Sequence, residues 1–353
     1  MERKMKRYDY SFLKEKHMND VLRLCKAIAD VNAREEMNRL QDPGIFESLR
    51  GKAVIDSVVG SNAIEGIGTS EKRLKEILNN GGVPLTHDEI EILGYKDALN
   101  LIHTEYDELE ISEALIRQLH YLIERNTGAE DAGQYKKADN YIMEFRSDGS
   151  GSIIFTPVSY KEVPASMEQL LLAYYSARQD DQIDQLLLSL CFVLDFLCIH
   201  PFRDGNGRVS RLLMLLLLYK AGYDIGRYVS VEKNINEHRE QYYHCLKESS
   251  EGWHDNMNDY SPFIVFSLQI LYRCYLTLND TLGELSVKRV KKNQRIEMTV
   301  LNSIVPVSKA QIKEKLLDVS IRTIESELRK LLASGKIIKI GNYKDARYMR
   351  ADQ

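Results

Sequence analysis

Two apolar segments joined by a short polar loop constrain the fold of this chain most. Residues 186–199 and 209–221 are largely hydrophobic, and the second segment contains an unbroken apolar run from Leu212 to Leu218. Segments of this length and character predict buried helices rather than strands. The loop between them, residues 200–208, is polar and carries two glycines. We therefore expect a helical core that presents this loop for chemistry.

The loop contains groups that can hold phosphates. Gly205 and Gly207 allow the backbone around Asn206 to adopt conformations that a Cβ forbids, and they lie where the second helix begins. Unpaired amide groups and the helix dipole at such a terminus can hold a phosphate without a lysine. Arg208 and Arg211 are three residues apart, so we expect both side chains on one helical face, within reach of further phosphate oxygens.

Two other loop residues suit catalysis. Asp204 offers hard oxygen ligands for a Mg²⁺ ion shared with phosphates, and His200 can accept a proton from an attacking hydroxyl. Each residue type also has an ordinary explanation: a histidine at a helix end is commonly a cap, Asp-Gly-Asn-Gly is a common turn, and paired arginines often form a solvated surface. A structural turn does not require all of these groups together, whereas phosphoryl or nucleotidyl transfer does.

Residues 200–211 resemble the active-site signature of the Fic family, His-x-Phe-x-Asp/Glu-Gly-Asn-Gly-Arg-x-x-Arg, with every fixed position present. The resemblance implies a mainly helical Fic fold with a small β-hairpin flap, and transfer of AMP from ATP to a Ser, Thr or Tyr hydroxyl of a protein. It leaves self-modification and assembly into a homo-oligomer open. Because relatives that phosphorylate their targets depart from the Gly-Asn-Gly-Arg-x-x-Arg half, nucleotidyl transfer is the expected reaction.

The resemblance also implies a role for each signature residue. His200 is implied to be the base that deprotonates the target hydroxyl, and Asp204 to hold Mg²⁺ against the α- and β-phosphates. Phe202 is implied to anchor the loop in the core. The remaining fixed positions are implied to bind ATP, with an anion hole and a grip on the outer phosphates formed by Gly205, Asn206, Gly207, Arg208 and Arg211.

A second motif lies far upstream, in residues 61–66. Apolar residues recur at helical spacing from about residue 52, and this motif ends the pattern. Taken alone, Glu-Gly at a helix end is ordinary C-capping. Beside the loop, Ser61 to Gly66 resembles the Fic inhibitory motif, Ser/Thr-x-x-x-Glu-Gly/Asn, placed before the catalytic core. The resemblance implies that Glu65 pairs with Arg211 and occupies the space of the ATP γ-phosphate, since a carboxylate and a phosphate compete for one guanidinium fork.

A β-hairpin is expected between the two motifs. Residues 141–146 and 152–156 have the composition of strands, and they flank the glycine-rich turn sequence Ser-Asp-Gly-Ser-Gly. An isolated hairpin in a helical chain is marginal unless it packs on something, so one interpretation is a surface ornament. Its position before the signature resembles the Fic flap, whose exposed edge aligns a target segment by strand addition. The residues implied to dock the target are Ile153, Ile154 and Phe155.

The region after the signature contains candidates for an adenine pocket. Residues 234–243 and the single Trp253 resemble the part of Fic proteins that surrounds the adenine. Asn236, Tyr242 and Tyr243 are the candidates for hydrogen bonding to the base or stacking on it. Adjacent tyrosines on a helix point in different directions, so at most one of the two is expected to stack.

Composition indicates a globular chain. With 353 residues, 44% hydrophobic and 28% charged, it can bury a large core and is expected to divide into two or three units. The N-terminus is basic without a following apolar segment, and neither apolar helix reaches membrane-spanning length. Five scattered cysteines without metal-type spacing are most simply reduced thiols. We therefore expect a cytoplasmic protein that does not enter a membrane.

The C-terminal region differs in character from the rest. A basic stretch precedes three helical patterns, residues 295–304, 308–316 and 320–334, and then a hairpin pattern, so the region resembles a winged helix-turn-helix. From Arg295 onward there are 12 basic and 7 acidic residues, whereas the whole chain carries a net charge of −4. This contrast suits DNA, but acidic residues on the expected recognition helix weaken contact with a phosphate backbone. A protein-binding or dimerisation module is therefore favoured over a DNA-binding one.

Three regions are expected: an N-terminal helical region with the inhibitory helix (1–110), the Fic core with flap and signature (111–285), and a basic linker with the winged helix (286–353). The favoured function is an autoinhibited adenylyltransferase that uses ATP and Mg²⁺. Two alternatives stay open: a DNA-binding regulator whose Fic core senses nucleotide, and an enzyme that removes AMP from proteins. Retention of the base His200 favours an enzyme, because a sensor needs the phosphate grip but not the base.

Overall fold

The two apolar segments form adjacent helices in the core. In the computed structural model of the protein, α7 (Gln185–Ile199) packs against α8 (Asn206–Lys220), and nearly all of their side chains are buried. Both helices confirm the sequence prediction, although α8 begins three residues earlier than the apolar pattern does. The four core cysteines and Cys25 are free thiols, as expected.

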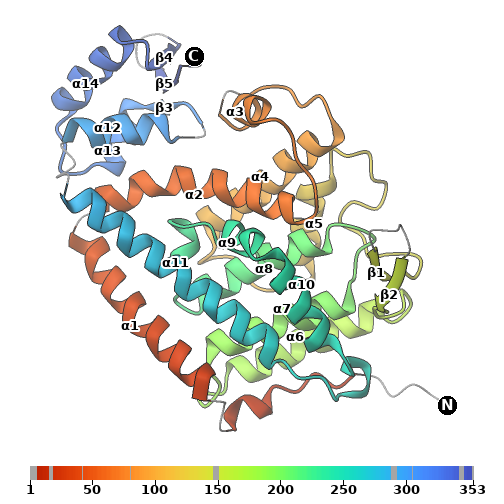
Figure 1. Ribbon diagram of the computed structural model, residues 1–353. Coiled ribbons are helices and arrows are strands. Elements are labelled where there is room, and N and C mark those ends of the chain that lie inside the picture. The colour runs from red at the N-terminus through yellow and green to blue at the C-terminus, as the bar shows by residue number, and fades with distance from the viewer. Residues whose placement is uncertain are drawn as a thin grey trace.

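The structure describes residues 6–15, 19–41, 43–79, 81–145, 151–287, 292–303, 305–341 and 346–351. Within these ranges the fold is mainly helical, which confirms the expected fold class (Figure 1). The other helices of the first 287 residues are α1 (Asn19–Gln41), α2 (Pro43–Ile64), α3 (Glu71–Asn79), α4 (His87–Glu105), α5 (Glu113–Glu124), α6 (Val163–Arg178), α9 (Val231–Glu237), α10 (Arg239–Ser250) and α11 (Ser261–Val287), with short 3₁₀ turns at Ser11–Lys14, Ile225–Arg227 and Trp253–Asp255.

Neighbouring helices surround the α7–α8 pair on several sides. α4 and α5 pack on α8, α6 packs on α7, and α2 runs across α4 and α9 (Figure 1). Two glycines allow close helix approach: a Cβ at Gly60 of α2 would lie 2.6 Å from the backbone nitrogen of Lys233, and a Cβ at Gly94 of α4 would lie 2.3 Å from the carbonyl oxygen of Ile123. These contacts pack α2 closely against α9 and α4 closely against α5.

α11 contains the longest apolar stretch in the described chain. By length and composition alone, Ser261–Gly283 could cross a membrane, which was not expected from the sequence. In the fold, α11 packs along α1, α9 and α10, and Phe263, Leu268 and Tyr275 are among the side chains of the core. Burial in the core therefore accounts for its apolar character.

A two-stranded antiparallel hairpin confirms the predicted flap strands. β1 (Ile142–Phe145) pairs with β2 (Gly151–Phe155), with Phe145 opposite Gly151 and an irregularity between Ile142 and Met143. The predicted turn was residues 147–151; residues 146–150 lie outside the described residues, and Gly151 begins β2. β2 packs near α10, so the hairpin lies beside the end of α7 and the signature.

The C-terminal residues form a unit with its own hydrophobic core. Its helices α12 (Lys292–Leu301), α13 (Lys309–Lys315) and α14 (Ile321–Ala333) and its hairpin strands β4 (Ile337–Ile340) and β5 (Arg347–Arg350) follow the predicted order. A third strand, β3 (Val307–Ser308), pairs with β5 and was not expected, because two residues are too few for a strand pattern. The unit contacts the rest of the protein through α2.

Candidate active site

His200 ends α7 and starts the signature loop. Its backbone φ is 52°, a left-handed conformation that few residues with a Cβ adopt and that turns the chain sharply. The imidazole Nδ1 lies 3.3 Å from the carbonyl oxygen of Leu197. Because a carbonyl only accepts, this contact places a proton on Nδ1 and leaves Nε2 free to act as a base. Burial, with help from the charge of Lys136, lowers the pKa of His200 to about 4, so the ring is neutral at pH 7.

Asn206 and Phe202 hold the loop together. The side chain of Asn206 accepts from the backbone N–H of Phe202 and donates to its carbonyl, both at 2.9 Å, as a pair of backbone hydrogen bonds would. The Phe202 ring is buried and stacks on the imidazole of His120, with ring centres 3.9 Å apart. Phe202 is thus the core anchor that the resemblance implied.

The N-terminus of α8 is available to an anion. Gly205 precedes the helix with φ of 73°, and no side chain in the described residues caps this end. The first backbone bond of the helix is donated by Val209 to the carbonyl of Gly205. The amide groups of Asn206, Gly207 and Arg208 therefore lack partners within the helix, which is the arrangement that binds phosphates at helix N-termini.

The end of α2 lies at this terminus. Gly66 has φ of 78°, and the N–H groups of Gly66 and Ile67 bond back to the carbonyls of Ala63 and Asn62 at 3.1 and 3.0 Å. This is the Schellman arrangement of a helix C-terminus, so the expected C-capping is confirmed. It fixes Glu65 directly after the helix. α2 begins at residue 43, about nine residues before the apolar pattern indicated.

Glu65 and Ser61 bind Arg211. The guanidinium Nη2 lies 2.8 Å from Glu65 Oε1, and Arg211 also donates to the Ser61 hydroxyl at 2.8 Å and to the Ser61 carbonyl at 3.0 Å. The Arg211 side chain is 1% exposed and that of Glu65 is 32% exposed. A Cβ at Gly207 would lie 2.2 Å from Glu65 Oε1, so only glycine lets the carboxylate approach α8 this closely. The contact implied by the resemblance is present.

A cavity of about 570 Å³ opens beside these groups. Its lining includes signature residues, the carboxylate that binds Arg211, both candidate tyrosines and residues of the hairpin: His200, Gly207, Arg211, Glu65, Tyr242, Tyr243, Ile142, Met143, Ile154 and Phe155. The Tyr243 hydroxyl donates to the carbonyl of Ile64 at 3.2 Å, so α10 contacts the end of α2. The N-terminus of α8, His200 and the β1–β2 hairpin thus border one space large enough for a nucleotide.

Three residues named as candidates for the adenine pocket or the flap do not line this cavity. Asn236 lies on α9 and Ile153 on β2, but neither is among the described residues that line the cavity. Trp253 is buried, and its indole N–H donates to Asp195 at 2.6 Å, so it is a core residue rather than part of an adenine pocket. Both adjacent tyrosines line the cavity, and which one stacks on a base stays a prediction.

Asp204 faces a second cavity, of about 990 Å³, together with His120, Glu124 and Lys136. One carboxylate oxygen accepts from the N–H of Gly205 at 2.6 Å, and the other has no partner among the described residues. An exposed carboxylate beside an anion-binding helix terminus fits Mg²⁺, which takes one or two carboxylates with phosphates and waters. The metal role of Asp204 stays a prediction.

Arg208 has surroundings that the sequence did not indicate. Its side chain is 1% exposed and forms ion pairs with Glu91 of α4 and with Glu124 of α5, the latter at 3.0 Å. It is not among the described residues that line either cavity. Residues three apart on a helix are rotated by about 60°. As a result, the two signature arginines reach separate acidic partners instead of presenting a shared surface.

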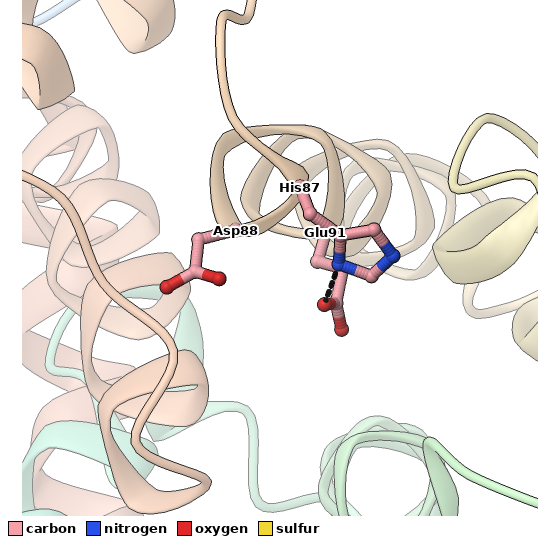
Figure 2. Close-up of side chains that lie close together, drawn as sticks. All are labelled: His87, Asp88 and Glu91. Carbon is pink, nitrogen blue, oxygen red and sulfur yellow. Dashed lines mark ion pairs between the residues drawn. The ribbon is translucent and has the colours of Figure 1, made fainter.

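Glu91 also belongs to a cluster at the start of α4. His87, Asp88 and Glu91 place their ligand atoms within 4.8 Å of one another, and His87 Nδ1 lies 2.7 Å from Glu91 (Figure 2). The other oxygen of Glu91 binds Arg208, so a cation in this cluster would compete with a guanidinium. No sequence spacing relates Glu91, Glu124 or His120 to the signature, and only the fold brings them to it.

Residues 110–218 match the Fic/DOC family. These residues include the signature loop, so this part of the chain is similar to Fic domains. Two curated relatives are similar to it: "Protein adenylyltransferase Fic" of Drosophila grimshawi, 30% identical over 177 residues, and "Protein adenylyltransferase fic-1" of Caenorhabditis elegans, 27% identical over 241 residues. These alignments cover 50% and 65% of this chain but only 32% and 42% of the relatives, so the chain spans less than half of their length.

Solved structures show the same fold. A Fic family protein from Desulfovibrio desulfuricans G20 superposes with a TM-score of 0.61 at 20% identity, covering 96% of this chain and 98% of that protein. A segment of Fic-1 from C. elegans superposes with a TM-score of 0.59 at 22% identity, covering 75% and 73%. The Fic fold expected from the signature is therefore confirmed.

Proposed function

We propose that this chain is an ATP-dependent protein adenylyltransferase held inactive by Glu65. The supporting observation is the position of the Glu65 carboxylate, which binds Arg211 and lies against Gly207 at the N-terminus of α8. A phosphate group binds the same two kinds of donor, a guanidinium and the free amides of a helix N-terminus. The similarity of the Fic domain to proteins named adenylyltransferases supports the same reaction.

The chemistry follows from the neutral imidazole. His200 Nε2 takes the proton of a target hydroxyl as its oxygen attacks the α-phosphorus of ATP, and diphosphate leaves with the electrons of the broken phosphorus–oxygen bond. The amides at the start of α8 hold the developing negative charge. Mg²⁺ bound by Asp204 would neutralise phosphate charge when present. A lowered pKa of His200 keeps the base in its active form at neutral pH.

The flap supports a protein target. Ile153 on β2 is exposed, whereas Ile154 and Phe155 line the cavity next to His200. A target segment that pairs with the edge of this hairpin would carry its hydroxyl past the base. Pairing through main-chain hydrogen bonds depends on few side chains of the target. It would therefore allow modification of several proteins or of the chain itself.

We propose a protein-binding role for the C-terminal unit, as a winged helix-turn-helix. Two lysines pair with glutamates of α14: Lys309 of α13 with Glu325 at 2.7 Å, and Lys330 of α14 itself with Glu327 at 3.2 Å. These pairs reduce the positive charge available to a nucleic acid. The free thiols suit a cytoplasmic location.

Labelled ATP tests the reaction. The Glu65→Gly variant is incubated with Mg²⁺ and either α-labelled or γ-labelled ATP, alone and in a host lysate, with His200→Ala as the matched control. Adenylyl transfer places only the α-label on protein, and omission of Mg²⁺ abolishes it. Protein that carries the γ-label would show phosphotransfer instead. Absence of α-label from every protein would contradict the proposal, and loss of AMP from pre-labelled protein would identify the reverse reaction.

A further inference from the structure

The two signature arginines differ in how their carboxylate partners are exposed. The Glu65 side chain is 32% exposed, whereas those of Glu91 and Glu124 are 8% exposed each. A carboxylate that borders water can leave its arginine and be rehydrated. Separation of Arg208 from its partners would leave charges buried without a counterion, which is strongly unfavourable. The pair Arg211–Glu65 can therefore exchange for a phosphate, while the Arg208 contacts are built to persist.

α5 supports the loop through His120, one turn before Glu124. His120 Nδ1 accepts from the N–H of Gly133 at 2.8 Å, so the ring proton lies on Nε2 and is donated to the carbonyl of Asp204 at 3.2 Å. The same ring stacks on Phe202.

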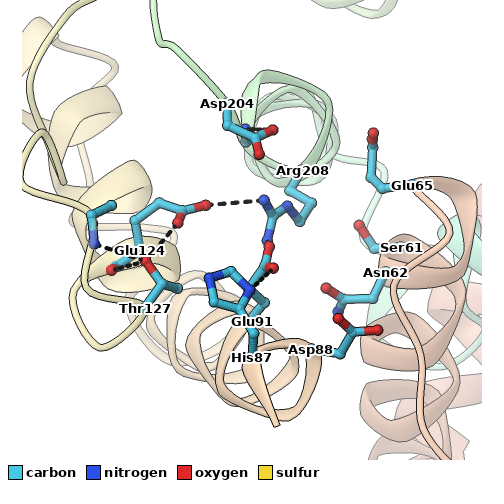
Figure 3. Close-up of polar contacts among 12 residues, drawn as sticks. Ser61, Asn62, Glu65, His87, Asp88, Glu91, Glu124, Thr127, Asp204 and Arg208 are labelled. Carbon is cyan, nitrogen blue, oxygen red and sulfur yellow. Dashed lines mark hydrogen bonds and ion pairs between the residues drawn. The ribbon is translucent and has the colours of Figure 1, made fainter.

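Gly205 rests on the same surface of α5. A Cβ at this position would lie 3.2 Å from Glu124 Oε1 and 3.4 Å from His120 Cδ2, so the loop backbone packs directly on both side chains. Figure 3 shows Arg208 with Glu91 and Glu124 on one side of the α8 N-terminus, while Ser61 and Glu65 lie apart from that group. Side chains of α4 and α5 thus hold the loop at three points: the carbonyl of Asp204, the ring of Phe202 and the guanidinium of Arg208.

We infer that His120, Glu91 and Glu124 are positioning residues for the phosphate site. They act through Asp204, Phe202 and Arg208 to hold the free amides of α8 in the geometry that binds ATP phosphates. Arg208 is the part of the loop that they grip rather than a ligand of the outer phosphates. This inference rests on the proposed function and replaces one role implied by the family resemblance.

The inference predicts opposite effects for two kinds of carboxylate. Loss of Glu65 opens the phosphate site, whereas loss of Glu124 distorts it. The Glu65→Gly protein is therefore the parent for the test, because its phosphate site is unobstructed. Glu124→Gln is added to it, and Glu89→Gln serves as the control. Like Glu124, Glu89 is a buried glutamate that pairs with an arginine: it lies on α4 and binds Arg73 at 2.8 Å. Among the described residues it makes no contact with the signature.

Affinity for ATP and for adenosine is measured by calorimetry, together with kcat and KM for transfer and the melting temperature. We expect Glu124→Gln to weaken ATP binding and to lower kcat/KM by about tenfold to a hundredfold, since small misplacements cost that much. Adenosine, which lacks phosphates, should bind within about twofold of the parent. Glu124→Asp should recover part of the loss, and Glu89→Gln should change neither ligand's affinity.

Three results would overturn the inference. ATP affinity and transfer equal to those of Glu89→Gln would mean that Glu124 positions nothing. Increased labelling would make Glu124 a second inhibitory carboxylate that competes with ATP for Arg208. If Glu124→Gln does not fold, Arg208→Lys decides: lysine keeps the charge but cannot bridge two carboxylates, so unchanged ATP binding would refute the bridging role. Binding is read independently of transfer, so a parent that binds ATP but does not adenylylate would refute the proposed function without deciding this one.

Discussion

The carboxylate of Glu65 and the guanidinium of Arg211 are 2.8 Å apart, although the residues are separated by 146 positions in the chain. α2 makes this contact, and Ser61, one turn earlier on the same helix, binds Arg211 twice. Loss of the Glu65 carboxylate would therefore leave Arg211 oriented by Ser61. The contact proposed to be inhibitory can thus be removed by one substitution while the arginine stays in place.

Glu65→Gly should raise self-labelling with ATP by one to two orders of magnitude. Removal of the carboxylate frees Arg211 and the amides beside Gly207 for phosphate oxygens. The gain corresponds to a reduction of about 1.4–2.8 kcal/mol in the barrier. Initial rates with α-labelled ATP measure it at saturating nucleotide.

Arg211→Ala is the control for this change. It also breaks the inhibitory contact, but it removes a phosphate ligand, so it should not reproduce the gain. Equal transfer rates for the parent and Glu65→Gly would refute the autoinhibition proposal. Faster removal of AMP by the parent than by the variant would instead assign Glu65 a role in the reverse reaction.

His200→Ala should reduce AMP transfer by the 10²–10⁴-fold that is typical for loss of a general base, while ATP affinity is retained. The imidazole borders the cavity proposed to hold ATP. Its proposed role is to accept the proton of the target hydroxyl, and ATP binding does not require that step. Titration calorimetry with ATP and transfer assays in the Glu65→Gly background separate the two properties. Labelling at the parent rate would show that the base is another group.

Acid should destabilise the folded protein before it protonates His200 or His120. Both residues have pKa values lowered to about 4 by burial, against about 6.5 in an unfolded chain. The unfolded state therefore binds protons more readily, so stability is complete above about pH 6.5 and falls as the pH approaches 4. At pH 5 each histidine costs on the order of 1–2 kcal/mol. Melting temperatures at pH 7.5 and 5 should differ by less in His120→Gln than in the parent; an equal difference would contradict the burial of this imidazole.

Local patterns predicted the parts of the fold that depend on neighbours in sequence. The apolar runs of α7 and α8, the C-capping of α2 and the hairpin strands all follow from composition and spacing over a few residues. The signature and the inhibitory motif together predicted the contact between Glu65 and Arg211 because a family resemblance links them. The helical order of the C-terminal unit was also readable, apart from the two residues of β3.

Contacts made by tertiary packing were not predictable. Glu91 and Glu124 precede their partner Arg208 by 117 and 84 residues, and nothing in the sequence around them marks them. Trp253 was expected near the adenine because of its position in the chain, whereas a buried carboxylate, Asp195, draws its indole into the core. A buried charge requires hydrogen-bond donors, and only the fold decides which ones supply them.

α2 joins the contact between Glu65 and Arg211 to the C-terminal unit. Near the start of α2, the backbone carbonyl of Ser48 accepts a hydrogen bond of 3.0 Å from the side chain of Asn302 in the C-terminal unit. Glu47 pairs with Lys315 of the same unit at 3.0 Å. A Cβ at Gly51 would lie only 1.7 Å from the carbonyl oxygen of Asn302, so backbone meets backbone there. At the other end of the same helix, Glu65 holds Arg211. We propose that a displacement at one end of α2 reaches the other end, because rigid helices packed at both ends can carry coupling between sites.

Gly51→Leu should therefore raise self-labelling, although less than Glu65→Gly does. The new side chain cannot fit against Asn302, so α12 must move off α2 or α2 must shift, and either change weakens the position of Glu65. Gly283→Leu is the matched control, because a Cβ at Gly283 of α11 meets nothing within 4 Å. We expect a severalfold gain for Gly51→Leu and none for the control, with limited proteolysis reporting release of the C-terminal unit. If proteolysis shows that the C-terminal unit is released while labelling stays at the parent rate, the contact between Glu65 and Arg211 does not depend on that unit. If labelling rises, a partner that binds the unit and separates it from α2 would activate transfer.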